Sequence, residues 1–167
     1  MNLFTIALLF VVVGAHLSMG ILYRGTVCGW AESTTTEPIR CNGSDPRHSC
    51  PINYTKLAFA DGTSLCYKSN TTTEVQHGLP GTICGGLARN PCGRVSPAEK
   101  CPTGYIQDFR HVCYKNDSKI EDLPGTFCGI ISDDVGITCD QSPVGKCPTG
   151  YLAINYDAEK WHACAKE

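Results

Sequence analysis

Twelve cysteines, arranged as one four-cysteine pattern that occurs three times, constrain the fold of this chain more than any other feature. The first cysteine of each set lies in a Gly-Thr-apolar-Cys-Gly segment. The third begins a Cys-Pro-x-Gly-Tyr segment, in which the first set has Asn53 in place of glycine. Repetition of this kind indicates a unit copied along the chain, so the sequence predicts three diverged modules. The three sets are Cys28, Cys41, Cys50 and Cys66; Cys84, Cys92, Cys101 and Cys113; and Cys128, Cys139, Cys147 and Cys164.

The spacing of the cysteines predicts where the modules begin and end. The gap between the second and third cysteines holds 8, 8 and 7 residues, whereas the first gap holds 12, 7 and 10 and the last gap holds 15, 11 and 16. Because loops tolerate changes in length, the middle gap is interpreted as the fixed frame. Two polar segments without cysteine, 69–78 and 116–122, are interpreted as linkers. The predicted modules cover residues 21–69, 79–116 and 123–167.

Each module is expected to depend on its disulfides, because about 45 residues bury too little apolar area for stability without cross-links. No window sustains a helical apolar period over three turns, and turn-forming residues are frequent. This favours a small disulfide-rich fold of short β-strands and loops. Hairpins predicted over 106–112 and 152–161 would return the fourth cysteine beside the third. The sequence alone allows three pairings in each set, and the hairpins favour first with second and third with fourth.

The first residues have the order of a secretory signal peptide. An apolar run covers residues 3–13, Gly14 follows, and small side chains end at Gly20, after which we expect cleavage, with Ala15 as the second choice. The alternative is an uncleaved membrane anchor, but a span needs about 20 apolar residues and this run has about half that number. We therefore expect residues 1–20 to be removed and the product to be secreted and extracellular, without a membrane span.

The predicted secretory route makes disulfides the expected state of the cysteines. A zinc site is the competing interpretation, but structural zinc sites use closely spaced ligand pairs, whereas Cys84 and Cys92 have seven residues between them. We expect no metal and no cofactor. The formal net charge is −2, with lysine and arginine scattered along the chain, so the basic face that nucleic acid requires is missing and nucleic-acid binding is not expected.

Four Asn-x-Ser/Thr triplets are candidate sites for N-linked sugar. Their asparagines are Asn42, Asn53, Asn70 and Asn116, and two of these lie in the predicted linkers, where a glycan would be exposed to solvent. We expect a glycoprotein with at least two of the four sites occupied.

The run from Cys101-Pro102-Thr103-Gly104-Tyr105 to Cys113-Tyr114-Lys115 resembles the opening hairpin of long-form C-type lectin domains, where a Cys-Pro-x-Gly-aromatic turn is disulfide-bonded to a later Cys-Tyr. The rest of such a domain, with its calcium-binding motifs, has no counterpart in this chain. In cysteine order and in this turn, the copies also resemble the tandem short cysteine-rich repeats of secreted nematode proteins such as the DX-type modules. That resemblance implies a secreted protein and brings no catalytic residue.

The sequence gives little support to an enzyme. Neither His-Glu-x-x-His nor Gly-x-Ser-x-Gly occurs, and the histidines lie in unrelated contexts. With every cysteine assigned to a bridge, no thiol remains to act as a nucleophile. We expect a non-catalytic protein.

Aromatic rings are the candidate contacts for a partner. Tyr54, Tyr105 and Tyr151 occupy one position of the repeated pattern, and Trp30 and Trp161 add two indoles. Ring faces suit protein or carbohydrate contacts, which predicts an extracellular protein or carbohydrate partner bound through repeated modules. The alternative interpretation is that the tyrosines pack on the disulfides as small cores.

Inhibition of an extracellular protease is the rival function. A stapled loop is preorganised for binding, and Arg89, Arg94 or Arg110 could enter a trypsin-like pocket. The third set has no arginine at a corresponding place, so no inhibitory position is repeated.

Overall fold

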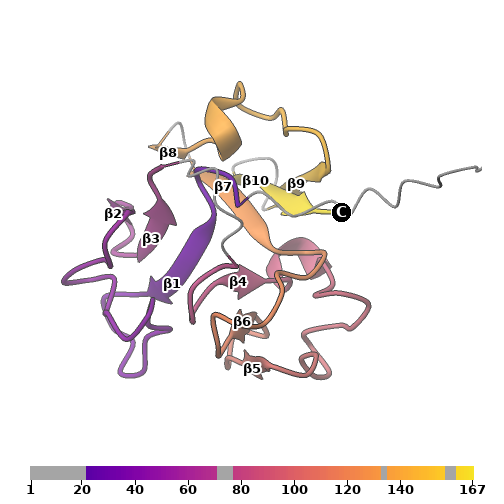
Figure 1. The fold of residues 1–167 in the computed structure, drawn as a ribbon. Coiled ribbons are helices and arrows are strands. Elements are labelled where there is room, and N and C mark those ends of the chain that lie inside the picture. Colours follow the sequence, from indigo (N-terminus) through magenta and orange to yellow (C-terminus); the bar gives the residue numbers. More distant parts are fainter. Residues whose placement is uncertain (1–21, 71–76, 133–134, 157–160) are drawn as a thin grey trace, which may run out of the picture.

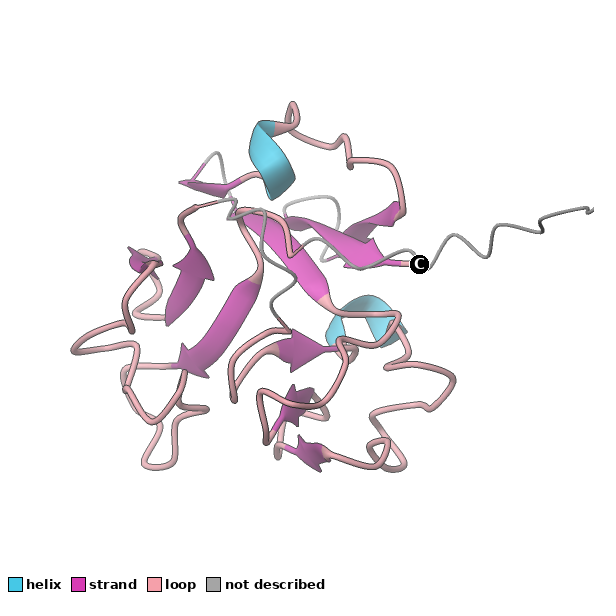
Figure 2. Ribbon diagram, in the orientation of Figure 1, coloured by secondary structure: helices cyan, strands magenta, loops and turns pink. Residues whose placement is uncertain are grey.

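The computed structural model describes residues 22–70, 77–132, 135–156 and 161–167. The predicted leader and most of the first predicted linker lie outside these residues. Short strands and loops make up the described chain, together with two short 3-10 helices, η1 (Leu87–Arg89) and η2 (Cys139–Gln141) (Figure 2). The expected class, a small disulfide-rich fold of short strands and loops, is confirmed.

The strands form three antiparallel sheets, one from each set of cysteines. The first sheet has the order β1-β3-β2 and the middle sheet has the corresponding order β4-β6-β5. The third sheet has the order β8-β7-β10-β9, in which β8 extends the shared pattern. The strands are β1 (Val27–Ala31), β2 (Tyr54–Ala58), β3 (Ser64–Lys68), β4 (Ile83–Cys84), β5 (Tyr105–Gln107), β6 (Cys113–Lys115), β7 (Phe127–Ser132), β8 (Val135–Ile137), β9 (Tyr151–Tyr156) and β10 (Trp161–Lys166).

The strand register is the same in the three sheets. In each, the first cysteine of the set lies opposite the fourth, as Cys28 does opposite Cys66. Six disulfides join first with second and third with fourth cysteines, so the favoured pairing is confirmed. The predicted hairpins, β5–β6 and β9–β10, bring the fourth cysteine back to the third. The disulfides are Cys28–Cys41, Cys50–Cys66, Cys84–Cys92, Cys101–Cys113, Cys128–Cys139 and Cys147–Cys164.

Backbone hydrogen bonds join the three sheets into a closed ring. In each link, the N–H of the glycine after the first cysteine of one set donates to the carbonyl of the glycine before the threonine in another set. The links are Gly29 to Gly81 (2.8 Å), Gly85 to Gly125 (2.9 Å) and Gly129 to Gly25 (2.8 Å). The last link returns from the third sheet to the first, which gives the ring approximate threefold symmetry. In Figure 1, β1, β4 and β7 lie towards the centre.

The close approach at these links explains the glycine before each threonine. Gly81 has φ +97° and Gly125 has φ +95°, in the left-handed region that glycine adopts without strain. A Cβ at Gly81 would collide with the carbonyl oxygen of Arg40, and one at Gly125 would collide with that of Pro91. The repeated Gly-Thr segment therefore reflects contacts between sets as well as within them.

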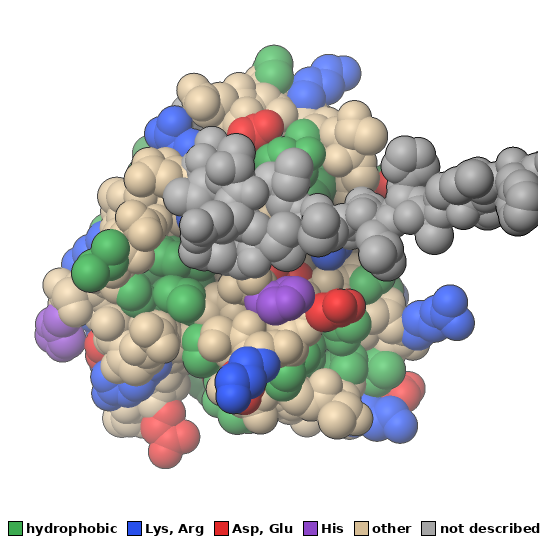
Figure 3. Space-filling view, in the orientation of Figure 1, with side chains coloured by type: hydrophobic (Ala, Val, Ile, Leu, Met, Phe, Trp, Pro, Cys, Tyr) green, Lys and Arg blue, Asp and Glu red, His purple; other side chains and the backbone are tan. Residues whose placement is uncertain are grey.

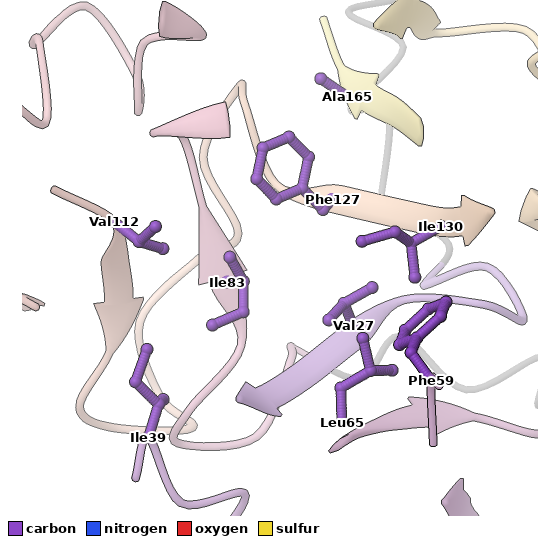
Figure 4. Close-up of a cluster of buried hydrophobic side chains, with 9 residues drawn as sticks. All are labelled: Val27, Ile39, Phe59, Leu65, Ile83, Val112, Phe127, Ile130 and Ala165. Atoms are coloured by element: carbon purple, nitrogen blue, oxygen red, sulfur yellow. The ribbon is translucent and has the colours of Figure 1, made fainter. Parts of the chain in front are cut away.

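One hydrophobic core lies where the three sheets meet. Val27, Ile83 and Phe127 occupy the same position in their sets and all belong to this cluster (Figure 4). Leu65, Val112 and other residues of the hairpins complete it. Because each sheet supplies part of one core, none of the three buries its apolar face by itself.

Candidate functional site

The threefold pattern breaks at the residue two positions after the first cysteine. This residue is Trp30 in the first set, Gly86 in the middle set and Ile130 in the third. Gly86 has φ +103°, and a Cβ there would lie 2.6 Å from the carbonyl oxygen of His111, so the backbone requires glycine. The middle set also has the shortest first and last gaps, and β4 has only two residues. At this end of the ring the middle sheet therefore fills less space than its neighbours.

Two hollows open at this end, and we call them together the Trp30 groove. Both are lined by Trp30 and Glu32. The apolar hollow, of about 340 Å³, adds Ile39, Ile83, Gly86, Leu87, Arg110 and Val112. The polar hollow, of about 360 Å³, adds Ser33, Thr34, Asp61, Thr63 and Trp161. The groove thus brings together the two tryptophans that the sequence suggested as contacts, from the first and third sets.

Both indoles are held by the fold. Trp30 exchanges two backbone hydrogen bonds of 2.9 Å with Ile39, and its ring packs against the shared core. Trp161 lies with its ring centroid 5.2 Å from that of Phe59. The buried Nε1 of Trp30 has no hydrogen-bond acceptor among the described residues. Buried polar atoms without a partner are uncommon and occur at functional sites.

A charge network fixes one side of the groove. Arg110 donates from Nη1 to Glu32 at 3.0 Å and from Nη2 to Asp108 at 3.0 Å. Partial burial by itself would lower the pKa of the Arg110 guanidinium, but the carboxylates of Asp108 and Glu32 outweigh it and raise that pKa. Arg110 therefore stays charged, and its ion pair with Glu32 ties the hairpin of the middle set to the first set.

A second network holds the loop that carries Ser33 and Thr34. Arg47 binds the Asp45 carboxylate at 2.7 Å and also donates to the backbone carbonyl of Thr35 at 2.7 Å. The Arg47 hydrogen bonds lower the pKa of Asp45 to about 2. Arg47, in the segment after Cys41, thus holds the loop that forms one wall of the polar hollow.

The three tyrosines proposed as contacts pack on the disulfides. Each belongs to a small cluster with the four cysteines of its own set, and Tyr105 is 8% exposed. The Tyr105 hydroxyl donates to the carbonyl of Glu121 at 3.1 Å. Burial raises the pKa of Tyr105 to about 12 and raises the pKa of Tyr54 and Tyr151 as well. Of the proposed contact residues, Trp30 and Trp161 line the groove, and the tyrosines pack on the disulfides.

The arginines named for protease inhibition lie in unlike settings. Arg110 is held by two carboxylates, as described above. Arg94 lies in a tight turn closed by mutual backbone hydrogen bonds between Cys92 and Val95. Arg89 is an exposed residue of η1 with φ +63°.

The opposite end of the ring is polar and more regular. Lys68, Lys115 and Lys166 end the last strand of their sets. The fully buried Lys115 places its Nζ 2.7 Å from Oδ1 of Asp122, whose backbone carbonyl accepts from Lys166 at 3.0 Å. Burial lowers the pKa of Lys115, and the attraction of Asp122 opposes that shift. The other carboxylate oxygen of Asp122 accepts from the backbone N–H of Gly78 at 2.8 Å.

All four candidate glycosylation asparagines are exposed. Asn70 and Asn116 follow the lysines that end β3 and β6, and the carbonyl of Asn53 accepts from Ser69 at 2.9 Å. The backbone N–H of Asn42 donates to Pro80, next to the link at Gly81. The four candidate sites therefore lie at or towards the lysine end of the ring, away from the hairpin ends that form the groove.

Charged side chains of both signs are scattered over the face seen in Figure 3. Within the described residues, no three His, Cys, Asp or Glu side chains are grouped closely enough to hold a metal ion. None of the helices in the described chain has the length and apolar character needed to cross a membrane. Comparisons with models of protein families, with curated proteins and with solved structures found no match to this chain.

Proposed function

We propose that the chain is a secreted, glycosylated, non-catalytic extracellular protein that binds a protein or carbohydrate partner at the Trp30 groove. The observation that carries this proposal is the groove itself, in which two preordered indoles line hollows of about 340 and 360 Å³. Tryptophan is the residue type most enriched among residues that dominate binding energy, and clefts of this size are typical of binding sites.

We further propose that the three sheets descend from one four-cysteine module, with copies at 21–69, 79–116 and 123–167. The common register, the common disulfide pairing and the cyclic hydrogen bonds support this origin. The groove draws on all three copies, so the partner meets one composite site.

Secretion and glycosylation are supported by the disulfide content and by the exposed sequons. Six disulfides in a chain of 167 residues fit an oxidising compartment. The sequons leave the groove end free of sugar. A non-catalytic role is supported by the polar hollow, where the hydroxyls of Ser33 and Thr34 have no histidine beside them among the described lining residues.

The test is to apply the secreted, full-length protein to arrays of extracellular proteins and of glycans. Thr34→Tyr places a bulky ring in the polar hollow, whereas Thr36→Tyr makes the same change at an exposed position of the same loop. We expect the partner to bind the wild type and the Thr36→Tyr variant alike and to bind Thr34→Tyr at least about tenfold more weakly, as for blockage of a central contact. Equal binding by the Thr34→Tyr and Thr36→Tyr variants would mean that the partner does not bind at the groove.

A further inference from the structure

The polar hollow has a distinct chemical character within the Trp30 groove. Its two ionisable residues, Glu32 and Asp61, are both acids, and no lysine, arginine or histidine occurs among its described lining residues. Glu32 shares its charge with Arg110, which lines the other hollow. Asp61 is exposed, and within the described chain no ion pair engages it. The described lining residues therefore offer a ligand a net negative charge.

A backbone hydrogen bond fixes the position of the Asp61 side chain. Its Oδ1 accepts the backbone N–H of Thr63 at 2.8 Å, in the turn that joins β2 to β3. Its carboxylate therefore faces the hollow from a fixed turn, with its other oxygen available to accept from a ligand. Thr63 itself is 4% exposed, so the turn is anchored in the core.

The indoles of Trp30 and Trp161 provide a second attraction for a cation, in addition to the Asp61 carboxylate. A cation over the face of tryptophan, within about 6 Å of the ring centroid, is attracted by the electron density of the ring. Trp30 and Trp161 line the same hollow as Asp61, and the packing of Trp161 on Phe59 fixes its ring. An aromatic wall with a carboxylate favours an organic cation with an apolar stem over a neutral sugar, because a sugar can stack on the ring and donate to the carboxylate but gains no attraction between charges.

We propose that the polar hollow binds the side chain of a lysine or arginine presented by a protein partner. This rests on the proposed function and narrows it to protein partners with an exposed basic segment. The methylene stem lies between the indoles, and the charged head pairs with Asp61. The neighbouring hydroxyls of Ser33 and Thr34 accept the remaining N–H bonds.

Intrinsic fluorescence tests this directly, because the chain has two tryptophans and both line the hollow. Intact secreted protein is titrated with pentalysine, with pentalysine acetylated on every side-chain amine, and with the neutral sugar chitotetraose. We expect saturable quenching or a shift of the emission with pentalysine. The acetylated peptide keeps the stem but loses the charge, so we expect it to bind at least about fivefold more weakly, as for a partly desolvated ion pair.

Two variants with the same change in net charge locate the effect. Asp61→Asn keeps an oxygen that can accept from Thr63 but removes the charge, and we expect it to weaken pentalysine binding about fivefold. Glu37→Gln removes an exposed charge from the loop outside the lining set and is expected to change binding less than about twofold.

Equal effects of Asp61→Asn and Glu37→Gln, or equal binding of the acetylated peptide, would overturn the inference. Binding of chitotetraose with no response to pentalysine would overturn it too, but would leave the groove as a binding site. If instead the Thr34→Tyr variant retained full binding to the array partner, the proposed function would fail whichever probe altered the fluorescence.

Discussion

The two ends of the ring differ in how closely they follow the threefold pattern. At the lysine end, each set contributes a lysine and a buried threonine, and the hydrogen-bonded links repeat within 0.1 Å of one another. At the groove end, the corresponding residues are Trp30, Gly86 and Ile130. Symmetry is kept where the sets join one another and is lost where a hollow is formed. On the proposed function, divergence at one end would give a copied unit its binding site while the other end maintains the ring.

The largest effect is expected at the lysine end, from Asp122→Ala. This variant leaves the fully buried Lys115 without its counter-charge and removes the acceptor for Gly78. Breaking a buried ion pair costs about 3 to 5 kcal/mol of unfolding free energy. Chemical denaturation with the disulfides intact measures it, and Glu121→Ala, at the exposed neighbouring residue, is the control. A loss below about 1 kcal/mol would mean that the lysine end does not hold the ring.

The ring links are tested by alanine at two glycines that share a positive φ. Gly81 has φ +97° and would place its Cβ against Arg40 of the first set, whereas Gly43 has φ +81° and no atom within 4 Å of a Cβ. Backbone strain of about 1 kcal/mol is common to both variants. The collision adds about 1 to 3 kcal/mol to Gly81→Ala alone. Equal destabilisation of the two variants would argue against close contact between the first and middle sets.

The smallest effect is expected when low pH breaks the ion pair between Asp45 and Arg47 at the groove end. The pKa of Asp45 in the folded protein, about 2, lies below its ordinary value of 3.8, because Arg47 stabilises the carboxylate. The stabilisation is complete above about pH 4 and is lost as the pH falls towards 2. We expect the Asp45–Arg47 pair to contribute about 1 kcal/mol to the unfolding free energy, since the pair lies near solvent. Asp45→Asn should lower the unfolding free energy at pH 7 by this amount and reduce the acid dependence between pH 4 and 2. If Asp45→Asn left the pH dependence of the unfolding free energy unchanged, Asp45 would not stabilise the loop through its charge.

Local features of the fold were predictable from the sequence because they depend on neighbouring residues. The disulfide pairing followed from the hairpin that returns Cys113 to Cys101, and the strands followed from turn residues on either side. Asn53 replaces glycine in the first set and has φ +67°, a conformation that asparagine tolerates better than most residues do. The same conformation recurs at Gly104 and Gly150.

The ring and the groove could not be predicted in this way. The ring is made by backbone bonds between sets, and these leave no side-chain pattern beyond the glycines. The groove depends on Glu32 and Asp61 of the first set and on Leu87 of the middle set, none of which was selected as a site residue. The available signals were indirect: the short gaps of the middle set, and Gly86 in the place of Trp30 and Ile130.

The shared core also changes what a single set can do. An isolated segment 79–116 would expose the face of Ile83 and Val112 that the other sheets cover. It would also lose its hydrogen-bonded links to both neighbours. We expect such a segment to keep its disulfides but to lack a fixed tertiary structure, as judged by near-ultraviolet circular dichroism.

Differential scanning calorimetry of the intact, oxidised protein tests the central claim most directly. If the three sets form one ring around one core, they unfold together in a single transition, and the ratio of calorimetric to van't Hoff enthalpy is about one. Three independent modules with similar stability would give one broad transition with a ratio of about three, or separate transitions. A ratio near one is the result that the closed ring predicts, and a ratio near three would contradict it.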